Sequence, residues 1–354
     1  MMNLQTGFKI ILCSSLLTFA ALITHTIVQA QSSSYYCHAI CSFAWSPGEQ
    51  NLLGAVNQYG LWLYRADDTD SEPRLFPYKH AHDLSFDPTG TTVAVAYCTD
   101  DVINTPCTGS LALFELATET WETLAQSKYP IENIKFSLDG KYVAFLAGGL
   151  NLINLTTRET IRIYAPIYTG NVLDYAIDPS SSRVAISSGF LSGHVFFGIT
   201  VWSILERRIE TATPFGIEAS AVTFTPDGTG ILFVEDDTEL SHWDLESEVI
   251  TSRGQLVKVK PDNINLFAFS ENSAYLAASL LDNGVPDDRN LLVWESASEA
   301  QVFALDPPRG RILDSIMINP AGRYVAFGDG GDKRMLVEVW ERETGTTRQL
   351  SLVP

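Results

Sequence analysis

The sequence is poor in basic residues. Its 354 residues include 23 Lys and Arg against 42 Asp and Glu, which gives a net charge of −19 at neutral pH. Proteins that bind DNA, RNA or anionic membranes need a basic surface to neutralise phosphate groups. We therefore expect neither a nucleic acid nor a membrane as the partner of the mature chain. The acidity fits an exported protein kept soluble by its charge, or one with a cationic or divalent-metal partner.

Recognisable catalytic motifs are also missing. The sequence has no Gly-x-Ser-x-Gly nucleophile turn, no Gly-Lys-Ser/Thr phosphate loop and no His-Glu-x-x-His zinc motif. The segment 187–194, SSGFLSGH, contains Ser and His without the surroundings of a catalytic triad. These absences favour a protein that is not an enzyme, and the sequence predicts no cofactor.

Long hydrophobic runs are absent except near the N-terminus. Lys9 precedes an apolar run over residues 10–23, and a polar stretch then leads to Val28 and Ala30. The run is shorter than the roughly 20 residues of a membrane-spanning helix, and small or aliphatic residues at 28 and 30 suit a signal-peptidase site. We predict a signal peptide over residues 1–30 and a secreted or periplasmic mature chain over 31–354. An uncleaved signal anchor is the alternative.

A hairpin pattern recurs seven times along the mature chain. Each copy has an apolar strand, a short turn that usually contains Pro, Asp or Gly, and a second apolar strand, and the copies are spaced by roughly 40–50 residues. The seven hairpins read FAWSPGEQNLLGAV, LSFDPTGTTVAVAY, IKFSLDGKYVAFLA, YAIDPSSSRVAISS, VTFTPDGTGILFVE, FAFSENSAYLAASL and IMINPAGRYVAFGD.

Two further strands follow every hairpin. The second strand of each hairpin is almost continuously apolar, which indicates burial on both faces, whereas the fourth strand is polar and suits an outer edge. Four-stranded sheets stacked radially satisfy both conditions, so the sequence predicts an all-β, seven-bladed β-propeller with four antiparallel strands per blade. The third strands end in the pairs Tyr64-Arg65, Phe114-Glu115, Ile153-Asn154, Trp202-Ser203, Trp243-Asp244, Trp294-Glu295 and Trp340-Glu341.

These seven units, which cover about residues 38–354, resemble the blades of WD-repeat β-propellers. Only Trp243-Asp244 spells the Trp-Asp dipeptide and no Gly-His pair precedes a strand, so the family's Asp-His-Ser-Trp tetrad is not carried over. A looser propeller of the translocation-protein or lactonase type is the alternative. We expect Trp243 to pack between blades, Asp244 to form the next turn, and residues 313–353 to build the whole of blade 7.

The resemblance implies a monomeric scaffold that binds a protein or peptide. Long connections between the second and third strands concentrate on one face, where insertions often mark a binding surface. A propeller hydrolase or lactonase with a metal at the central channel is the alternative, although no metal ligand is assigned. The predicted binding residues on this face are His80, His82, Asp100, Asp101, His194, Asp236, Asp237, Asp282, Asp287, Asp288, Arg289, Arg309, Arg311, Asp329 and Asp332.

Four cysteines remain after the signal peptide, and an even number in an exported protein suggests disulfides. Cys98 and Cys107 fall at paired ends of neighbouring strands in blade 2, where the separation of the Cα atoms suits a disulfide. Cys37 and Cys41 would then pair locally. Four cysteines allow three connectivities, so both pairings are expectations. His80 and His82 lie two residues apart in an extended chain, so both rings could face one ion.

Overall fold

The computed structural model describes residues 40–48, 50–68, 70–78, 80–99, 107–163, 171–189, 198–214, 216–217, 219–236, 239–256, 263–270, 272–281, 289–298, 301–305, 315–328 and 336–354. The chain divides into two units, Met1–Ser34 and Tyr35–Pro354, and only the second contains described residues. The predicted signal peptide therefore lies outside the described part. No described residue belongs to a helix that is long and apolar enough to cross a membrane.

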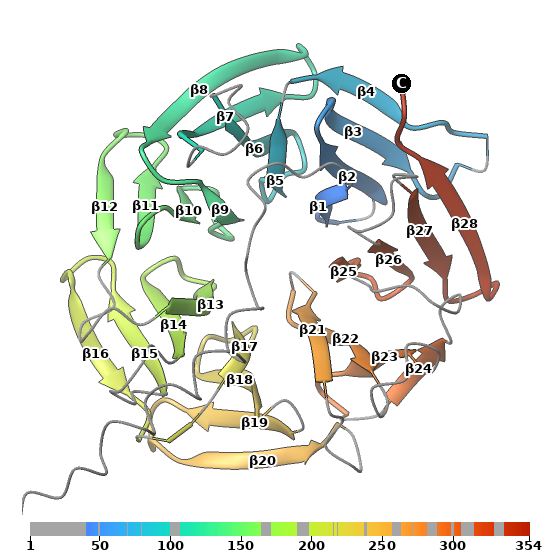
Figure 1. The fold of residues 1–354 in the computed structure, drawn as a ribbon. Helices are drawn as coiled ribbons and strands as arrows, with labels where there is room; N and C mark the ends of the chain where they lie inside the picture. Colours follow the sequence, from blue (N-terminus) through green and yellow to red (C-terminus); the bar gives the residue numbers. More distant parts are fainter. Residues whose placement is uncertain are drawn as a thin grey trace, which may run out of the picture. The chain divides into compact units, whose positions relative to one another are not determined.

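The second unit is a ring of seven four-stranded antiparallel sheets, which confirms the predicted propeller (Figure 1). The strands of a blade are named a to d in chain order, and in every blade they pair a–b, b–c and c–d. The first four blades consist of β1 (Ile40–Trp45), β2 (Leu52–Asn57), β3 (Gly60–Arg65) and β4 (Arg74–Pro77); β5 (Ala81–Phe86), β6 (Thr92–Cys98), β7 (Gly109–Glu115) and β8 (Thr120–Ser127); β9 (Glu132–Phe136), β10 (Tyr142–Leu146), β11 (Leu150–Asn154) and β12 (Thr160–Ile163); and β13 (Asn171–Ile177), β14 (Arg183–Gly189), β15 (Gly198–Ser203) and β16 (Arg208–Ala212).

The last three blades follow the same plan. Strands a lie innermost in the ring and strands d outermost (Figure 1). These blades consist of β17 (Ala219–Phe224), β18 (Gly230–Glu235), β19 (Glu239–Asp244) and β20 (Ile250–Gln255); β21 (Asn263–Phe269), β22 (Tyr275–Leu281), β23 (Arg289–Glu295) and β24 (Gln301–Leu305); and β25 (Ser315–Ile318), β26 (Tyr324–Gly328), β27 (Leu336–Glu341) and β28 (Thr346–Ser351).

Burial follows the order of the strands. Every residue of β26 is buried, whereas most residues of the outer strand β20 are exposed or half-buried. The apolar side chains pack between the faces of neighbouring blades, as Trp243 shows: it lies in one cluster with Val201 of blade 4 and Phe224 of blade 5. Asp244 accepts hydrogen bonds from the Ser247 N–H and hydroxyl groups and so forms the turn into strand d. Both roles expected for this Trp-Asp pair are confirmed.

The turns between strands a and b repeat one local structure. A cap residue follows strand a, and its side-chain oxygen accepts a hydrogen bond from the backbone N–H of the first residue of strand b. Six of the turns also close with a bond from the N–H three residues after the cap to the cap carbonyl, which is a type I turn with Ser, Asp, Thr or Asn first and Pro often second. The seven cap residues are Ser46, Asp87, Ser137, Asp178, Thr225, Ser270 and Asn319.

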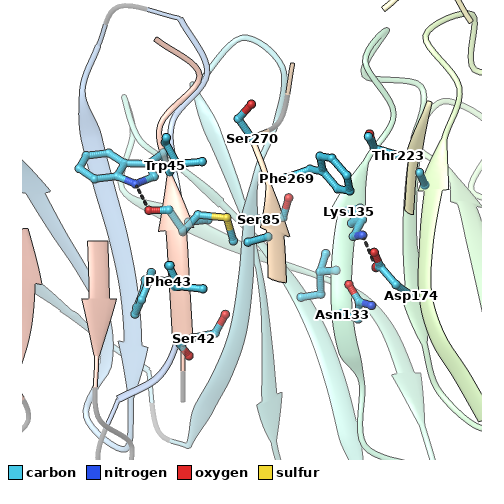
Figure 2. Close-up of a pocket in the computed structure, with 18 of the residues that line it drawn as sticks. Ser42, Phe43, Trp45, Ser85, Asn133, Lys135, Asp174, Thr223, Phe269 and Ser270 are labelled. Atoms are coloured by element: carbon cyan, nitrogen blue, oxygen red, sulfur yellow. Dashed lines mark hydrogen bonds and ion pairs between the residues drawn. The ribbon is translucent and has the colours of Figure 1, made fainter. Parts of the chain in front are cut away.

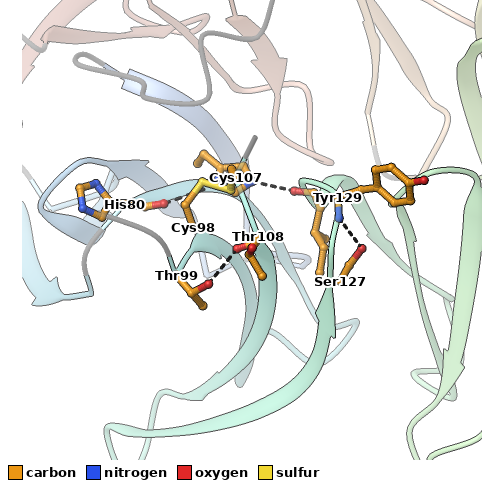
Figure 3. The surroundings of a disulfide bond; sticks show 9 residues. His80, Cys98, Thr99, Cys107, Thr108, Ser127 and Tyr129 are labelled. Carbon is orange, nitrogen blue, oxygen red and sulfur yellow. Dashed lines mark hydrogen bonds between the residues drawn. A yellow bond between two sulfur atoms is a disulfide. The ribbon is translucent and has the colours of Figure 1, made fainter. Parts of the chain in front are cut away.

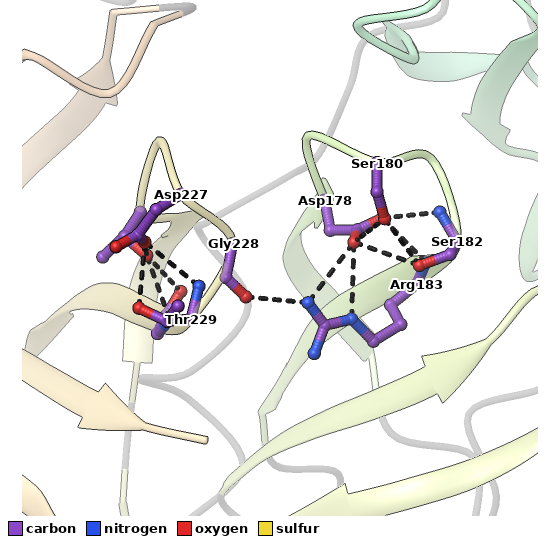
Figure 4. Close-up of polar contacts among 9 residues, drawn as sticks. Asp178, Ser180, Ser182, Arg183, Asp227, Gly228 and Thr229 are labelled. Carbon is purple, nitrogen blue, oxygen red and sulfur yellow. Dashed lines mark hydrogen bonds and ion pairs between the residues drawn. The ribbon is translucent and has the colours of Figure 1, made fainter. Parts of the chain in front are cut away.

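The a–b turns also bind to one another around the ring. Asp178 is fully buried and holds the guanidinium group of Arg183, which donates in turn to the Gly228 carbonyl of the next blade at 2.7 Å (Figure 4). Asn272 donates to the Pro320 carbonyl of the following blade at 2.8 Å. Side chains on this face therefore satisfy their own turns and hold neighbouring blades together.

Within the described residues, blades 7 and 1 close the ring without exchanging a strand. The described strands of blade 7 are β25 to β28, in agreement with the prediction from residues 313–353. The Asn57 side chain donates to the Leu352 carbonyl at 2.9 Å, and the Trp45 indole donates to the Met317 carbonyl at 3.2 Å. Trp45 also stacks on Tyr324, with ring centroids 5.8 Å apart. Aromatic packing and buried hydrogen bonds thus join the two ends of the described chain.

Candidate functional site

A cavity of about 470 Å³ occupies the centre of the ring. Strands a of all seven blades line it, and Figure 2 shows polar side chains on some of these strands and apolar side chains on others. Two positions in strand a recur in the lining, and they are counted back from the cap residue. Position −2 holds Ala44, Ser85, Lys135, Ala176, Thr223, Ala268 and Met317, which all line the cavity. Position −4 holds Ser42, Asp83, Asn133, Asp174, Ala221, Leu266 and Ser315, and the lining includes Ser42, Asp83, Asn133, Asp174 and Ser315.

A β-bulge lies next to position −4, which faces the channel together with position −2 because side chains two residues apart share a face of a strand. The pairing between strands a and b shifts register in six blades, for example between Ala81 and Asp83 and between Val172 and Asp174. A bulge bends its strand and re-aims a side chain. It also leaves backbone N–H groups without a partner in the sheet. Polar side chains at position −4 are therefore well placed to accept hydrogen bonds from a neighbouring blade.

Asp174 forms the charged centre of the channel wall. Its carboxylate accepts the Lys135 ammonium at 2.6 Å and the Val222 N–H at 3.0 Å, so that it joins blades 3, 4 and 5 (Figure 2). Lys135 also donates to the Tyr175 carbonyl at 2.5 Å. Asp174 and Lys135 are both half-buried, and an ion pair that is partly withdrawn from water is most stabilising when further hydrogen bonds complete it. Those bonds are present here.

Asp83 occupies the equivalent position in blade 2. Its carboxylate accepts the Ile134 N–H of blade 3 at 2.9 Å, the Leu84 N–H at 2.8 Å and a hydrogen bond from Ser42 of blade 1. The side chain keeps partial contact with the channel, yet protein surrounds it. This burial raises the pKa of Asp83 above that of an ordinary aspartate, although the three hydrogen bonds and His82 act in the opposite direction.

Tyr175 links the surroundings of the two aspartates. Its hydroxyl donates to the Asn133 carbonyl, and its ring is completely buried. Burial raises the pKa of Tyr175 well above its ordinary value, and the charges of Asp83 and Asp174 add to this effect. The hydroxyl therefore stays protonated and acts as a hydrogen-bond donor. Together these contacts form a polar belt that runs through blades 2, 3, 4 and 5.

The sequence-predicted site on the face of the b–c connections falls mainly outside the described residues. Of the residues predicted there, the structure describes the side chains of His80, His82 and Asp236, and the backbone of Arg289. Asp236 lies exposed in the turn after β18, and Arg289 begins β23. The residues outside the description are Asp100, Asp101, His194, Asp237, Asp282, Asp287, Asp288, Arg309, Arg311, Asp329 and Asp332.

The two histidines take up different backbone conformations. His80 has a left-handed φ of 57° directly before β5, whereas His82 lies within the strand. The His82 Nε2 atom donates to the Ile131 carbonyl at 2.7 Å and so connects blades 2 and 3. The rule that residues two apart face the same way applies to regular strand, and His80 is not in one. Within the described residues, no three His, Cys, Asp or Glu side chains lie close enough to share a metal ion.

The predicted disulfide between Cys98 and Cys107 is present (Figure 3). It joins Cys98 at the end of β6 to Cys107, which lies two residues before β7, and the two Cα atoms are 5.4 Å apart. Both cysteines are buried, and the Cys98 N–H donates to the His80 carbonyl at 3.1 Å. The bond closes the connection that contains Asp100 and Asp101. Cys41 is also disulfide-bonded, to a cysteine outside the described residues, so its pairing with Cys37 stays a prediction.

Comparison with known proteins assigns no family to the chain: no family model matches it, and no curated protein sequence is significantly similar. The seven-bladed propeller itself is established by the strand topology.

The polar belt was not found by reasoning from the sequence. Its signal is a charged residue within the innermost strand of a blade, as in the segments AHDLSF, ENIKF and NVLDYAI. Sequence spacing alone does not say which face of strand a lines the channel, so it does not place Asp83, Lys135 and Asp174 there.

Proposed function

We propose that this propeller is an exported, non-enzymatic scaffold that binds a protein or peptide partner on the face of its b–c connections. The main support for the proposal is that turn side chains on the opposite face already have structural roles. All seven a–b turns there use a side chain to cap strand b, and several of these turns bind the neighbouring blade. A residue that caps a turn or holds a neighbouring blade is less free to change to suit a binding partner.

The b–c connections differ from the a–b turns in length and charge. Only two residues separate β2 from β3, whereas residues 99–108 separate β6 from β7 and residues 282–288 separate β22 from β23. The long connections are rich in aspartate, with Asp287 and Asp288 adjacent in the sequence. Acidic groups on a chain of net charge −19 attract a partner with a basic surface and speed its approach. The Cys98–Cys107 disulfide fits an oxidising compartment outside the cytoplasm.

Charge reversal on the two faces tests this proposal. The mature chain, as a monomer on a solid support, is used to capture proteins from the extracytoplasmic fraction of its own source, and the bound proteins are quantified by mass spectrometry. The test variant carries Asp287→Lys, Asp288→Lys and Asp332→Lys. A matched control carries Asp67→Lys, Glu72→Lys and Glu246→Lys, three exposed acids in c–d turns of the opposite face.

We expect the test variant to lose at least about tenfold in specific yield, because like charges now face the basic partner. The control variant has the same net charge and should keep the wild-type yield. Capture of the same proteins at the same yield by the test variant would show that this face is not the binding surface.

A further inference from the structure

The repeat provides two equivalent carboxylates in the channel that differ in one respect. Asp83 and Asp174 both lie at position −4, and each accepts the backbone N–H at position −3 of the following blade, at 2.9 Å from Ile134 and 3.0 Å from Val222. Among the described residues, a lysine pairs with Asp174 and none pairs with Asp83. This lysine, Lys135, comes from position −2 of the preceding blade, and the ammonium reaches the Asp174 carboxylate at 2.6 Å.

The residue that would supply the cation to Asp83 is an alanine. Blade 1 precedes Asp83, and its position −2 is Ala44, which is half-buried and lines the cavity beside Asp83. Among the described residues, no Lys or Arg forms an ion pair with Asp83; its donors are two backbone N–H groups and Ser42. His82 is the nearby ionisable cation, and its Nε2–H is held by the Ile131 carbonyl.

The second acceptor of the Lys135 ammonium also has an equivalent beside Asp83. Lys135 donates a second bond to the Tyr175 carbonyl, at position −3 of blade 4. The equivalent carbonyl in blade 2 belongs to Leu84. An ammonium group has three donors and no acceptor, so a carboxylate and a carbonyl at these places suit it. A carboxylate that protein encloses is stabilised when an opposite charge comes within about 4–6 Å.

The cavity has room for a ligand that brings such a charge. Its volume of about 470 Å³ falls within the range of small-molecule sites, roughly 300–1,000 Å³. Met317 and Phe269 contribute apolar surface to the lining, against which the body of a ligand can pack. The net charge of −19 raises the local concentration of cations.

We propose that the channel binds a small organic cation with a primary ammonium group, which pairs with Asp83 over Ala44 as Lys135 pairs with Asp174. The ligand's ammonium donates to the Asp83 carboxylate and the Leu84 carbonyl, and its apolar part extends into the channel. This site lies in the channel wall, so it is separate from the partner face proposed above and does not depend on it.

The probe is n-butylamine, which is the lysine side chain without its backbone. Binding to the mature chain is measured by isothermal titration and by the shift in melting temperature, at constant pH and ionic strength. Sodium butyrate and n-butanol have the same carbon chain with an anionic or a neutral head. We expect saturable binding of one equivalent of butylamine and no saturable binding of the other two.

Two independent variants remove the site. Asp83→Asn deletes the charge, and Ala44→Lys supplies an internal ammonium to Asp83; each should weaken butylamine binding at least tenfold. Ala268→Lys, which adds the same charge at position −2 of blade 6, should change the affinity less than threefold. Reciprocally, Lys135→Ala should raise the stoichiometry from one to two, because it recreates the same vacancy at Asp174.

The proposal is overturned if the wild-type chain shows no saturable binding of butylamine or binds n-butanol equally well. It is also overturned if butylamine binds with unchanged affinity to folded Asp83→Asn and Ala44→Lys proteins, whose fold is checked by circular dichroism.

Discussion

On the a–b face, the first residue of every strand b donates its N–H to the cap residue, whereas the b–c connections that the structure describes share no such device. There, one connection is the tight turn between β2 and β3, and another is the disulfide-closed segment between β6 and β7. The same strands end on both faces, so the fold does not itself require the difference. Uniform ends indicate structural constraint, and variable ends leave room for binding.

Breaking the strongest a–b turn should have the largest effect on stability. Asp178 is buried and accepts the N–H groups of Ser182 and Arg183 and the Arg183 guanidinium group. Asp178→Ala leaves these donors and a positive charge without their acceptor, so we expect a loss of about 3 kcal/mol in the free energy of unfolding. Urea denaturation followed by tryptophan fluorescence measures it.

The turn of the next blade is the matched control for Asp178. Asp227 makes hydrogen bonds to Thr225 and Thr229 within its own turn, but it is exposed to solvent (Figure 4). Asp227→Ala should therefore shift the urea midpoint much less than Asp178→Ala. Equal shifts would mean that burial of the turn aspartate does not decide its contribution.

Removing the Cys98–Cys107 disulfide on the b–c face should lower the free energy of unfolding slightly less than Asp178→Ala does. The double variant Cys98→Ser, Cys107→Ser opens a short loop, and loop entropy assigns such a closure about 2–3 kcal/mol. The loss should appear as a lower urea midpoint, with a slope equal to or slightly above that of the wild type because the unfolded chain is less constrained. A midpoint equal to that of the wild type would show that the disulfide does not constrain the unfolded chain.

Strong acid should weaken the a–b turns that contain Asp139 and Asp227. Hydrogen bonds from Thr225 and Thr229 lower the pKa of Asp227 to about 2, and bonds from Lys141 and two serines lower the pKa of Asp139 to about 2 despite its burial. Both values lie below the ordinary aspartate pKa of about 3.9. The stabilisation is therefore complete above about pH 4 and is lost as the pH falls toward 2.

The double variant Asp139→Asn, Asp227→Asn isolates this effect. Its urea midpoint should change less between pH 4 and pH 2 than that of the wild-type protein, since two of the titrating groups are gone. Parallel curves for the two proteins over this range would contradict the assignment.

The sequence predicts the fold because the same strand and turn patterns recur in all seven blades. Seven hairpins in register, apolar second strands and polar fourth strands all follow from the alternation of side chains along β-strands. Even the caps can be read as Ser, Asp, Thr or Asn before a Pro-like position, as at Asp87 and Asp178. Blade 7 is complete in itself, as its continuous a-to-d pattern predicts.

The channel could not be predicted in the same way. Asp83 and Asp174 each place a charge in the innermost strand of a blade, and the sequence does not show which face of that strand lines the channel. His80 and His82 show the same limit, because the left-handed conformation of His80 breaks the alternation on which their predicted pairing rested. The contacts between blades, such as Lys135 with Asp174, join residues that are distant in the sequence.

The central claim is that stability resides on the a–b face and binding on the b–c face. Melting temperature and partner yield should be measured side by side for Asp178→Ala and for the triple variant Asp287→Lys, Asp288→Lys, Asp332→Lys. The account predicts a crossed result: the first variant melts earlier but captures normally while folded, and the second melts like the wild type but loses capture. A triple variant that keeps its capture, or an Asp178→Ala protein that loses it while folded, would contradict the account.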